Sequence, residues 1–215
     1  MKIISLITCC LMSFYQFAQQ SIIFKNPLPT RDGKVMAVDR SNYGTYQTSD
    51  EMINYIFDER GVSVFSTTVS SISKEMIRET GKYDVRNGYL FGVVEEDSIP
   101  CVFEDDRYYF GIRNRQTIIG EGQNNQLTKI SRSEYILNSQ VDGNFVPTLI
   151  RFTSAGCEFS YFDYDEEDLF FNEIKEKQIV DGEYFQVLIL DPDQEETSTL
   201  LKEKIFSETQ KLKKN

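Results

Sequence analysis

The segment Tyr135–Phe152, YILNSQVDGNFVPTLIRF, decides the fold, because Asp142-Gly143 separates two strand-like runs within it. Asp-Gly tolerates positive φ at both central positions, as the type I′ turn of a tight β-hairpin requires. The pattern recurs twice: Asn87-Gly88 separates Lys82–Arg86 from Tyr89–Val94, and Asp181-Gly182 separates Ile174–Val180 from Glu183–Leu190. Three such hairpins predict a mainly β fold, an antiparallel meander that forms a barrel or a sandwich.

Apolar residues elsewhere alternate with a period of two, as in half-buried strands. Examples are Ile53, Tyr55 and Phe57; Val62 and Val64; and Tyr108, Phe110 and Ile112. The continuous run Val187–Leu190 predicts a strand that is covered on both faces. Pro147 cannot donate a ladder hydrogen bond, so its strand is expected to be an edge strand or to carry a bulge.

The chain divides into four predicted regions. Residues 1–18 have a basic start at Lys2, an apolar stretch and Ala18, which predicts a signal peptide and export. Residues 19–42 are expected to be an irregular lead-in with one short strand at Lys34–Val38. Residues 43–192 form the predicted antiparallel β domain, and residues 193–213 a C-terminal helix packed on it.

The helix prediction depends on charge and periodicity at the end of the chain. Asp193 and Glu196 form a D-x-x-E start signal just after Pro192. Leu201, Ile205 and Leu212 share one helical face, while Lys211, Lys213 and Lys214 suit the negative end of a helix.

Composition limits the classes of partner. The 215 residues carry a net charge of −11, which disfavours binding to nucleic acid and to anionic lipid. No stretch after the signal is apolar enough to span a membrane, so we expect no transmembrane segment in the mature chain. The expected partners are therefore an unidentified small molecule or a protein of the cell envelope.

Several kinds of chemistry are excluded by residue type. Histidine is absent, so neither Ser-His-Asp nor Cys-His catalysis is possible, nor is a histidine-containing metal site. Ser71-Ile72-Ser73-Lys74 matches the S-x-x-K of penicillin-interacting enzymes, but the S-D-N and K-T-G partners of that motif are missing. Ser71 and Lys74 are therefore predicted to be solvent-facing residues at a strand end.

Acidic residues gather in clusters. The densest run is 163–168; the others are 95–97, 104–106, and Asp191, Asp193, Glu195 and Glu196. Such carboxylates are candidates for Ca²⁺ or for the acid pair of a glycosidase. Solvated hairpin turns are the alternative, and no metal ligand or acid pair can be nominated by residue. Tyr108-Tyr109-Phe110 and Tyr161-Phe162 are candidates for sugar stacking or for packing between strands.

Two cysteines, Cys101 and Cys157, remain after removal of the signal. In an oxidising compartment they either form a disulfide or stay separate buried thiols, and both alternatives are open at this point.

Gly44-Thr45-Tyr46, Phe57 with Gly61, and Gly81-Lys82-Tyr83 resemble the opening of secreted lipocalin-like domains, over residues 44 to about 120. The resemblance implies an up-and-down barrel with an apolar interior, although Tyr46 stands where tryptophan is usual. Similar residues recur 94 or 95 positions apart, which indicates either an internal duplication or only the residue types that β-hairpins commonly share. The pairs are Phe57 with Phe152, Gly61 with Gly156, Val64 with Phe159, and Gly88 with Gly182.

These features lead to one expected function and two alternatives. We expect an exported, non-enzymatic β domain that binds a small apolar ligand at the cell envelope, without a cofactor. The first alternative is a structural or adhesion-type interaction module with a filled core. The second is a histidine-free hydrolase that acts on polysaccharide through two carboxylates. No catalytic or cofactor-binding residue is nominated.

Overall fold

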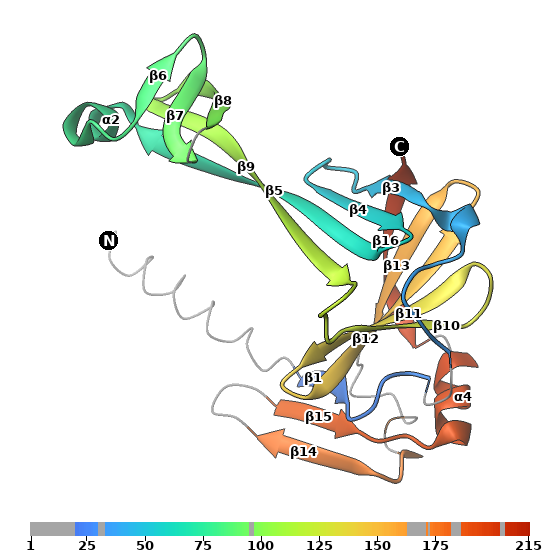
Figure 1. Ribbon diagram of the computed structural model, residues 1–215. Coiled ribbons are helices and arrows are strands. Elements are labelled where there is room, and N and C mark those ends of the chain that lie inside the picture. The colour runs from blue at the N-terminus through green and yellow to red at the C-terminus, as the bar shows by residue number, and fades with distance from the viewer. Residues whose placement is uncertain are drawn as a thin grey trace, which may run out of the picture.

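The computed structural model describes residues 20–29, 33–94, 97–162, 171, 173–181, 186–202 and 205–215. The predicted signal peptide at 1–18 lies outside these residues. Sixteen described strands belong to one sheet, and two α-helices accompany them, so the prediction of a mainly β fold is confirmed. Figure 1 shows a body of packed strands from which one long two-stranded ribbon, β5 with β9, projects toward a small outlying group of elements.

The elements are listed here with their bounds. The strands are β1 (Gln20–Phe24), β2 (Lys34–Val35), β3 (Gly44–Gln47), β4 (Ile53–Asp58), β5 (Gly61–Ser73), β6 (Asp84–Arg86), β7 (Tyr89–Val94), β8 (Asp97–Glu104), β9 (Arg107–Ile119), β10 (Gln126–Lys129), β11 (Glu134–Val141), β12 (Asn144–Thr153), β13 (Gly156–Phe162), β14 (Lys177–Asp181), β15 (Gln186–Leu190) and β16 (Phe206–Lys214). The helices are α2 (Lys74–Thr80) and α4 (Gln194–Lys202), and a 3₁₀ turn, η1, covers Arg40–Asn42.

The sheet runs β14-β15-β1-β12-β13-β16-β3-β4-β5-β9-β8-β7-β6, with β11 also on β12, β10 on β11 and β2 on β10. Among these strands β9 pairs with β5 and β8, and β10 pairs with β11 and β2. No backbone ladder between described residues therefore joins β9 to β10, and the sheet is not closed into a barrel. The place where β9 and β10 fail to pair is called the open seam below.

The main core gathers side chains from both sides of the body. Tyr46, Phe57 and Val62 come from β3, β4 and β5, and they meet residues of β10 to β13 and β16 such as Phe152 and Leu212. A second cluster fills the space between β1, β15 and α4, where Phe24, Leu190 and Leu200 are completely buried. Burial of these side chains is the principal stabilising contribution to the body.

The predicted tight hairpins are confirmed at two places. Arg86 lies opposite Tyr89, with φ of 52° at Asn87 and 79° at Gly88. Val141 lies opposite Asn144, with φ of 49° at Asp142 and 83° at Gly143. These positive values are those of a type I′ turn.

The third hairpin differs in register. Strands β14 and β15 pair, but Asp181 lies opposite Gln186, so residues 182–185 connect them instead of a two-residue turn at Asp181-Gly182. Gly182 itself lies outside the described residues. The prediction of two paired strands was right, and the prediction of their register was wrong.

The 95-residue spacing corresponds to two equivalent hairpins. Gly61 opens β5 after a two-residue turn from β4, and Gly156 opens β13 in the same way after β12. An added Cβ would lie 2.1 Å from the Ile119 carbonyl oxygen at Gly61 and 2.0 Å from that of Leu212 at Gly156. Both positions require glycine because the neighbouring strand's backbone approaches so closely.

The predicted C-terminal helix over 193–213 is wrong beyond its first half. Helix α4 ends at Lys202, and Phe206–Lys214 form strand β16. This strand pairs with β13 along most of its length and with β3 at its end, and Leu212 enters the main core. The helical spacing of Leu201, Ile205 and Leu212 did not determine the structure here. As a strand, Phe206–Lys214 supplies the backbone hydrogen bonds that the edges of β13 and β3 would otherwise lack.

The lead-in at 19–42 is also more regular than expected. Gln20–Phe24 form β1, which pairs in parallel with β15 and touches β12 at Phe24. The parallel pair and the insertion of β16 between β13 and β3 interrupt the expected antiparallel meander. The short strand predicted at Lys34–Val38 is present as the two residues of β2.

Pro147 lies in β12, which is neither an edge strand nor bulged against β11. The proline stands where β12 changes partners, between Thr148, which pairs with β13, and Phe145, which pairs with β1. Its missing donor is tolerated because the ladder on that side is interrupted there.

Candidate functional site

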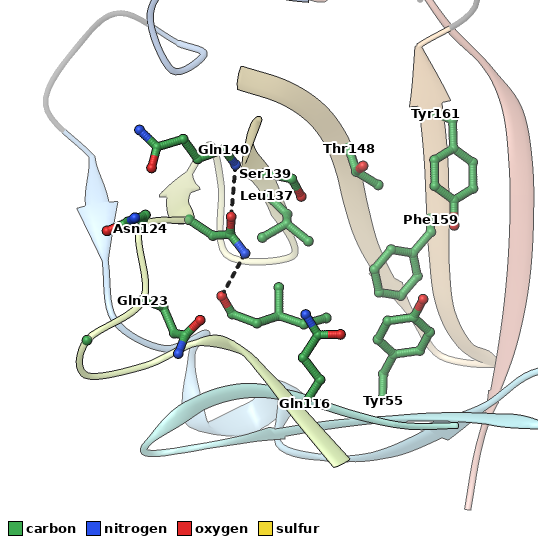
Figure 2. A pocket seen from close by; sticks show the side chains of 13 residues that line it. Tyr55, Gln116, Gln123, Asn124, Leu137, Ser139, Gln140, Thr148, Phe159 and Tyr161 are labelled. Atoms are coloured by element: carbon green, nitrogen blue, oxygen red, sulfur yellow. Dashed lines mark hydrogen bonds between the residues drawn. The ribbon is translucent and has the colours of Figure 1, made fainter. Parts of the chain in front are cut away.

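A cleft of about 580 Å³ lies beside the open seam, between β9 and the β9–β10 connection on one side and β11 on the other. Strands β4, β12 and β13 complete it. Its lining is uncharged: the carboxamides Gln116, Gln123, Asn124, Asn125 and Gln140, the hydroxyls Ser139 and Thr148, the aromatic residues Tyr55, Phe159 and Tyr161, and Ile118, Leu137 and Gly122. Figure 2 shows Gln123, Asn124 and Gln140 across the cleft from the aromatic rings, with Gln116 beside Tyr55.

Asn125 bridges the open seam with its side chain. Its Nδ2 donates to the Ile118 carbonyl of β9 at 3.0 Å, and its Oδ1 accepts from the Gln140 N–H of β11 at 2.8 Å. One amide therefore satisfies a backbone group on each side where a β ladder would otherwise run. This bridge holds the connection 120–125 in place and keeps the two walls of the cleft together.

Four other carboxamides in the lining have unused capacity. Within the described part of the chain, the side chains of Gln116, Gln123, Asn124 and Gln140 form no hydrogen bond, and all four residues are exposed. Each carboxamide offers two donors and an acceptor with two lone pairs. This wall can therefore donate a hydrogen bond to a ligand group and accept one from it. A hydroxyl group uses both kinds of bond.

The opposite wall is aromatic. The rings of Tyr55 and Phe159 lie with centroids 4.5 Å apart and an interplanar angle of 34°. Burial raises the pKa of the Tyr55 hydroxyl, and Tyr161 and Cys157 add to that shift, so Tyr55 is neutral at physiological pH. The Tyr161 hydroxyl donates to Gln210 Oε1 at 3.1 Å, which fixes that ring against β16. These rings give the cleft an apolar surface with polar edges.

The lining of the cleft does not contain the acid pair of a carboxylate hydrolase. A carboxylate hydrolase needs two acids about 5–9.5 Å apart. None of the residues that line the cleft is acidic or basic.

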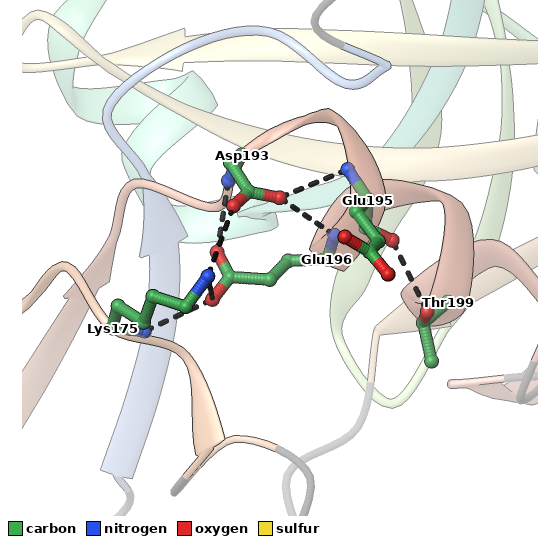
Figure 3. A network of polar contacts seen from close by, with 5 residues as sticks. All are labelled: Lys175, Asp193, Glu195, Glu196 and Thr199. Atoms are coloured by element: carbon green, nitrogen blue, oxygen red, sulfur yellow. Dashed lines mark hydrogen bonds and ion pairs between the residues drawn. The ribbon is translucent and has the colours of Figure 1, made fainter.

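The acids near the end of the chain serve the start of α4, as the D-x-x-E pattern predicts (Figure 3). Asp193 Oδ1 accepts from the Glu195 and Glu196 backbone N–H groups, each at 2.9 Å, and Glu196 Oε2 accepts from the Asp193 N–H at 2.9 Å. Lys175 Nζ lies 3.3 Å from Asp193 Oδ2. The Glu196 N–H bond is the main cause of the lowered pKa of Asp193, and Lys175 lowers it further.

The remaining acidic candidates do not assemble into a site. Asp191 pairs with Lys25 at 2.7 Å and accepts from Asn26. Asp105 and Asp106, both at positive φ, form the exposed turn between β8 and β9, next to Glu104. The run 163–168 and residues 95 and 96 lie outside the described residues. Among those described, no three acids or cysteines come together to hold a metal ion.

The S-x-x-K residues have structural contacts. Ser71 Oγ accepts from Arg107 Nε at 2.9 Å, and Ser73 caps helix α2 by accepting from the Met76 N–H. Lys74 is exposed as predicted, but it begins α2 and does not end a strand; its Nζ lies 5.8 Å from the centre of the Phe103 ring.

The cysteines are both free thiols, which answers the disulfide question left open above. Cys101 lies in the outlying cluster of β5–β9 and α2, whereas Cys157 belongs to the main core. Burial raises the pKa of Cys157 to about 12, so this thiol is unreactive in the folded protein.

The outlying elements carry an exposed apolar face. Directly opposed residues on adjacent strands point to the same side of a sheet. Val102 of β8 lies opposite Tyr109 of β9, and Pro100, two residues before Val102, lies opposite Tyr89 of β7. All four side chains therefore share one side. Val102 is 67% exposed and Tyr89 is 45% exposed. Val69 and Phe91 extend this face, which we call the arm face.

Sequence reasoning singled out Tyr161 but missed the amide wall of the cleft. Gln116, Gln123 and Asn124 stand in polar sequence that resembles any exposed loop or strand. Tyr108 and Tyr109, named with Tyr161 as stacking candidates, lie instead on β9 in the outlying elements.

Comparison of the chain with protein-family models, with curated proteins and with solved structures finds no match. None of the described helices has the length and apolar character needed to cross a membrane.

Proposed function

We propose that this protein is an exported, non-enzymatic binding domain whose ligand is a neutral, hydroxyl-rich molecule, a short glycan being the best fit. The observation that carries the proposal is the uncharged cleft at the open seam, with carboxamides on one wall and aromatic rings on the other. Export is proposed from the sequence of residues 1–18.

The composition of the cleft identifies the ligand class. Sugar hydroxyls both donate and accept hydrogen bonds, and carboxamides do the same. Sugar rings also have apolar C–H faces, which pack against aromatic faces such as those of Tyr55 and Tyr161. A charged ligand would find no ion-pair partner in this lining. The apolar ligand expected from the sequence would leave the amides without partners, at a cost in free energy.

Isothermal titration calorimetry with neutral hexasaccharides of glucose and of N-acetylglucosamine tests the proposal, with the apolar dye ANS as the contrasting ligand. We expect saturable binding of a sugar, weakened about fivefold by Gln116→Ala, the usual effect of losing one hydrogen bond. Asn114→Ala is the matched control, because Asn114 is exposed on the same strand, outside the cleft. Binding of ANS in the cleft with no sugar bound would contradict the proposal.

A second candidate function is the protein-interaction module, which the arm face favours. An exposed apolar face of several large side chains commonly marks a contact with another macromolecule. A photo-crosslinking residue at Val102 in producing cells would form a discrete adduct if the arm face meets a partner, whereas one at exposed Arg113 would not.

A further inference from the structure

A second pocket, of about 430 Å³, is formed by the 3₁₀ turn η1 with the residue that follows it and by the turn between β4 and β5. Its lining consists of Arg40, Tyr43, Asp58, Glu59 and Arg60. Four of these five residues are charged, two of each sign, whereas the lining of the cleft at the open seam is uncharged. The two cavities share no lining residue, so this pocket suits a different class of ligand.

Two of the four charges pair with each other. Asp58 Oδ1 accepts from the Arg60 backbone N–H at 2.8 Å, and Asp58 Oδ2 lies 3.3 Å from Arg60 Nη2. This contact engages both oxygens of the Asp58 carboxylate but only one nitrogen of the Arg60 guanidinium. Because a guanidinium carries five N–H donors, Arg60 keeps donors for a ligand.

The other two charges have no partner in the part of the chain that the structure describes. The Arg40 guanidinium and the Glu59 carboxylate form no hydrogen bond or ion pair there, although they have opposite signs and line the same pocket. Both residues are exposed. The Tyr43 hydroxyl likewise forms no hydrogen bond among the described residues. A cation, an anion and a hydroxyl therefore line one cavity, and the two charges lie too far apart to pair directly.

The backbone that carries Arg40 is fixed on both sides. Before η1, the Asp39 N–H donates to the hydroxyl of the completely buried Tyr135 at 2.9 Å. At the end of η1, the Asn42 side chain donates to the Arg132 carbonyl at 2.9 Å. The place of Arg40 on the body is therefore set before a ligand binds, which lowers the entropic cost of binding.

The other side of the pocket is fixed as well. Gly61, which ends the turn that carries Glu59, packs so closely on β9 that an added Cβ would lie 2.1 Å from the Ile119 carbonyl oxygen. Tyr43 is partly buried and packs against the main core. The pocket thus has a fixed backbone on both sides, and the long charged side chains are the parts that adjust to a ligand.

We propose that this pocket binds a small zwitterion, a molecule that carries one ammonium and one carboxylate group, as an amino acid does. The Arg40 guanidinium holds the carboxylate through two parallel N–H bonds, the geometry in which guanidinium and carboxylate groups match. The Glu59 carboxylate accepts from the ammonium, and Tyr43 offers its hydroxyl or the face of its ring to the same group. A simple anion or cation would leave either Glu59 or Arg40 without a partner. This site is separate from the proposed glycan cleft and does not depend on it.

Isothermal titration calorimetry of the full chain with a series of ω-amino acids tests the proposal. The number of methylene groups in these molecules sets the distance between the ammonium and the carboxylate. Butyrate and butylamine, which carry one charge each, are the control ligands. We expect saturable binding that is tightest at one chain length and about tenfold tighter than that of either control, because a zwitterion gains a second charged hydrogen bond.

Two variants assign the two ends of the ligand. Arg40→Ala is expected to weaken binding of the best ω-amino acid about tenfold, to the level of butylamine, and Glu59→Gln to weaken it to the level of butyrate. Both positions are exposed, so both variants are expected to stay folded. Arg113→Ala is the matched control, because Arg113 is an exposed arginine of β9 outside the pocket, and it should bind like the unchanged protein.

Three results would overturn the proposal. The first is binding of butyrate or of inorganic phosphate as tight as that of every ω-amino acid, which would indicate a simple anion site. The second is an equal loss in Arg40→Ala and Arg113→Ala, which would indicate nonspecific attraction by charge. The third is the absence of saturable binding of any member of the series at tens of millimolar.

Discussion

Phe57 and Phe152 meet edge to face in the main core, with ring centroids 5.1 Å apart and an interplanar angle of 82°. They occupy the same position in the two equivalent hairpins, β4–β5 and β12–β13. The contact joins the two sides of the body, and Tyr46 packs against both rings at 5.5 Å.

We expect Phe57→Ala and Phe152→Ala each to lower the free energy of unfolding by about 3–5 kcal/mol, because each leaves a large cavity in a buried cluster. The double variant should lose less than the total of the two, since the residues touch. Denaturant titration measures these changes. Val102→Ala is the control and should change stability by about 0.5 kcal/mol or less, because Val102 is 67% exposed. If the loss in the double variant equalled the sum of the two single losses, the contact between the two rings would not contribute to stability.

The Asn125 bridge predicts a difference between two substitutions. Asn125→Ala removes the acceptor for the Gln140 N–H and the donor to the Ile118 carbonyl, whereas Asn125→Asp keeps the acceptor. Hydrogen exchange should show the Gln140 amide protected in the unchanged protein and in Asn125→Asp, and fast-exchanging in Asn125→Ala. Equal protection in all three would mean that another group satisfies this amide.

The cap of α4 predicts a change with pH. The pKa of Asp193 is lowered below its usual 3.8 in the folded protein, so its ionised form stabilises the fold above that value. This contribution is lost as the pH falls through the folded-state pKa. In the variant Asp193→Asn, the new side chain still caps the helix but carries no charge. Thermal unfolding from pH 5 to pH 2 should therefore show a shallower loss in Asp193→Asn, and an unchanged slope would contradict the assignment.

The burial of the two thiols predicts that alkylating reagents label them slowly and at unequal rates. Cys157 is 1% exposed and its pKa is raised to about 12, so iodoacetamide at pH 8 should modify it only after unfolding. Cys101 is partly exposed and should react first, although burial raises its pKa as well. Mass spectrometry of labelled peptides distinguishes the two sites. A Cys101–Cys157 disulfide in the purified protein would contradict the placement of the two residues in separate clusters.

Local signals in the sequence predicted the local structure well. Asn87-Gly88 and Asp142-Gly143 form their turns, and Asp193 with Glu196 starts α4, because each depends on residues within a few positions. The partners of β1 and β16 were not predictable in this way. Phe206–Lys214 became a strand because β13 and β3, far away in the sequence, need a partner between them.

The candidate site could not be predicted from the sequence either, because it also depends on contacts between distant segments. Gln116 and Gln140 belong to different strands, and they come together only because the sheet stays open between β9 and β10. Their residue type carries no signal on its own. Tyr161 was recognised as a stacking candidate, but its partners in the cleft depend on the pairing of β13 with β16.

The most direct test of the proposed function is an NMR titration of the ¹⁵N-labelled protein with the neutral hexasaccharides. The account predicts saturable shifts of the side-chain amide signals of Gln116, Gln123 and Asn124 and of the backbone of residues 137–140, with signals of the arm face unchanged. Shifts confined to the arm face, or no shift at millimolar sugar, would contradict the assignment of the cleft as a glycan-binding site.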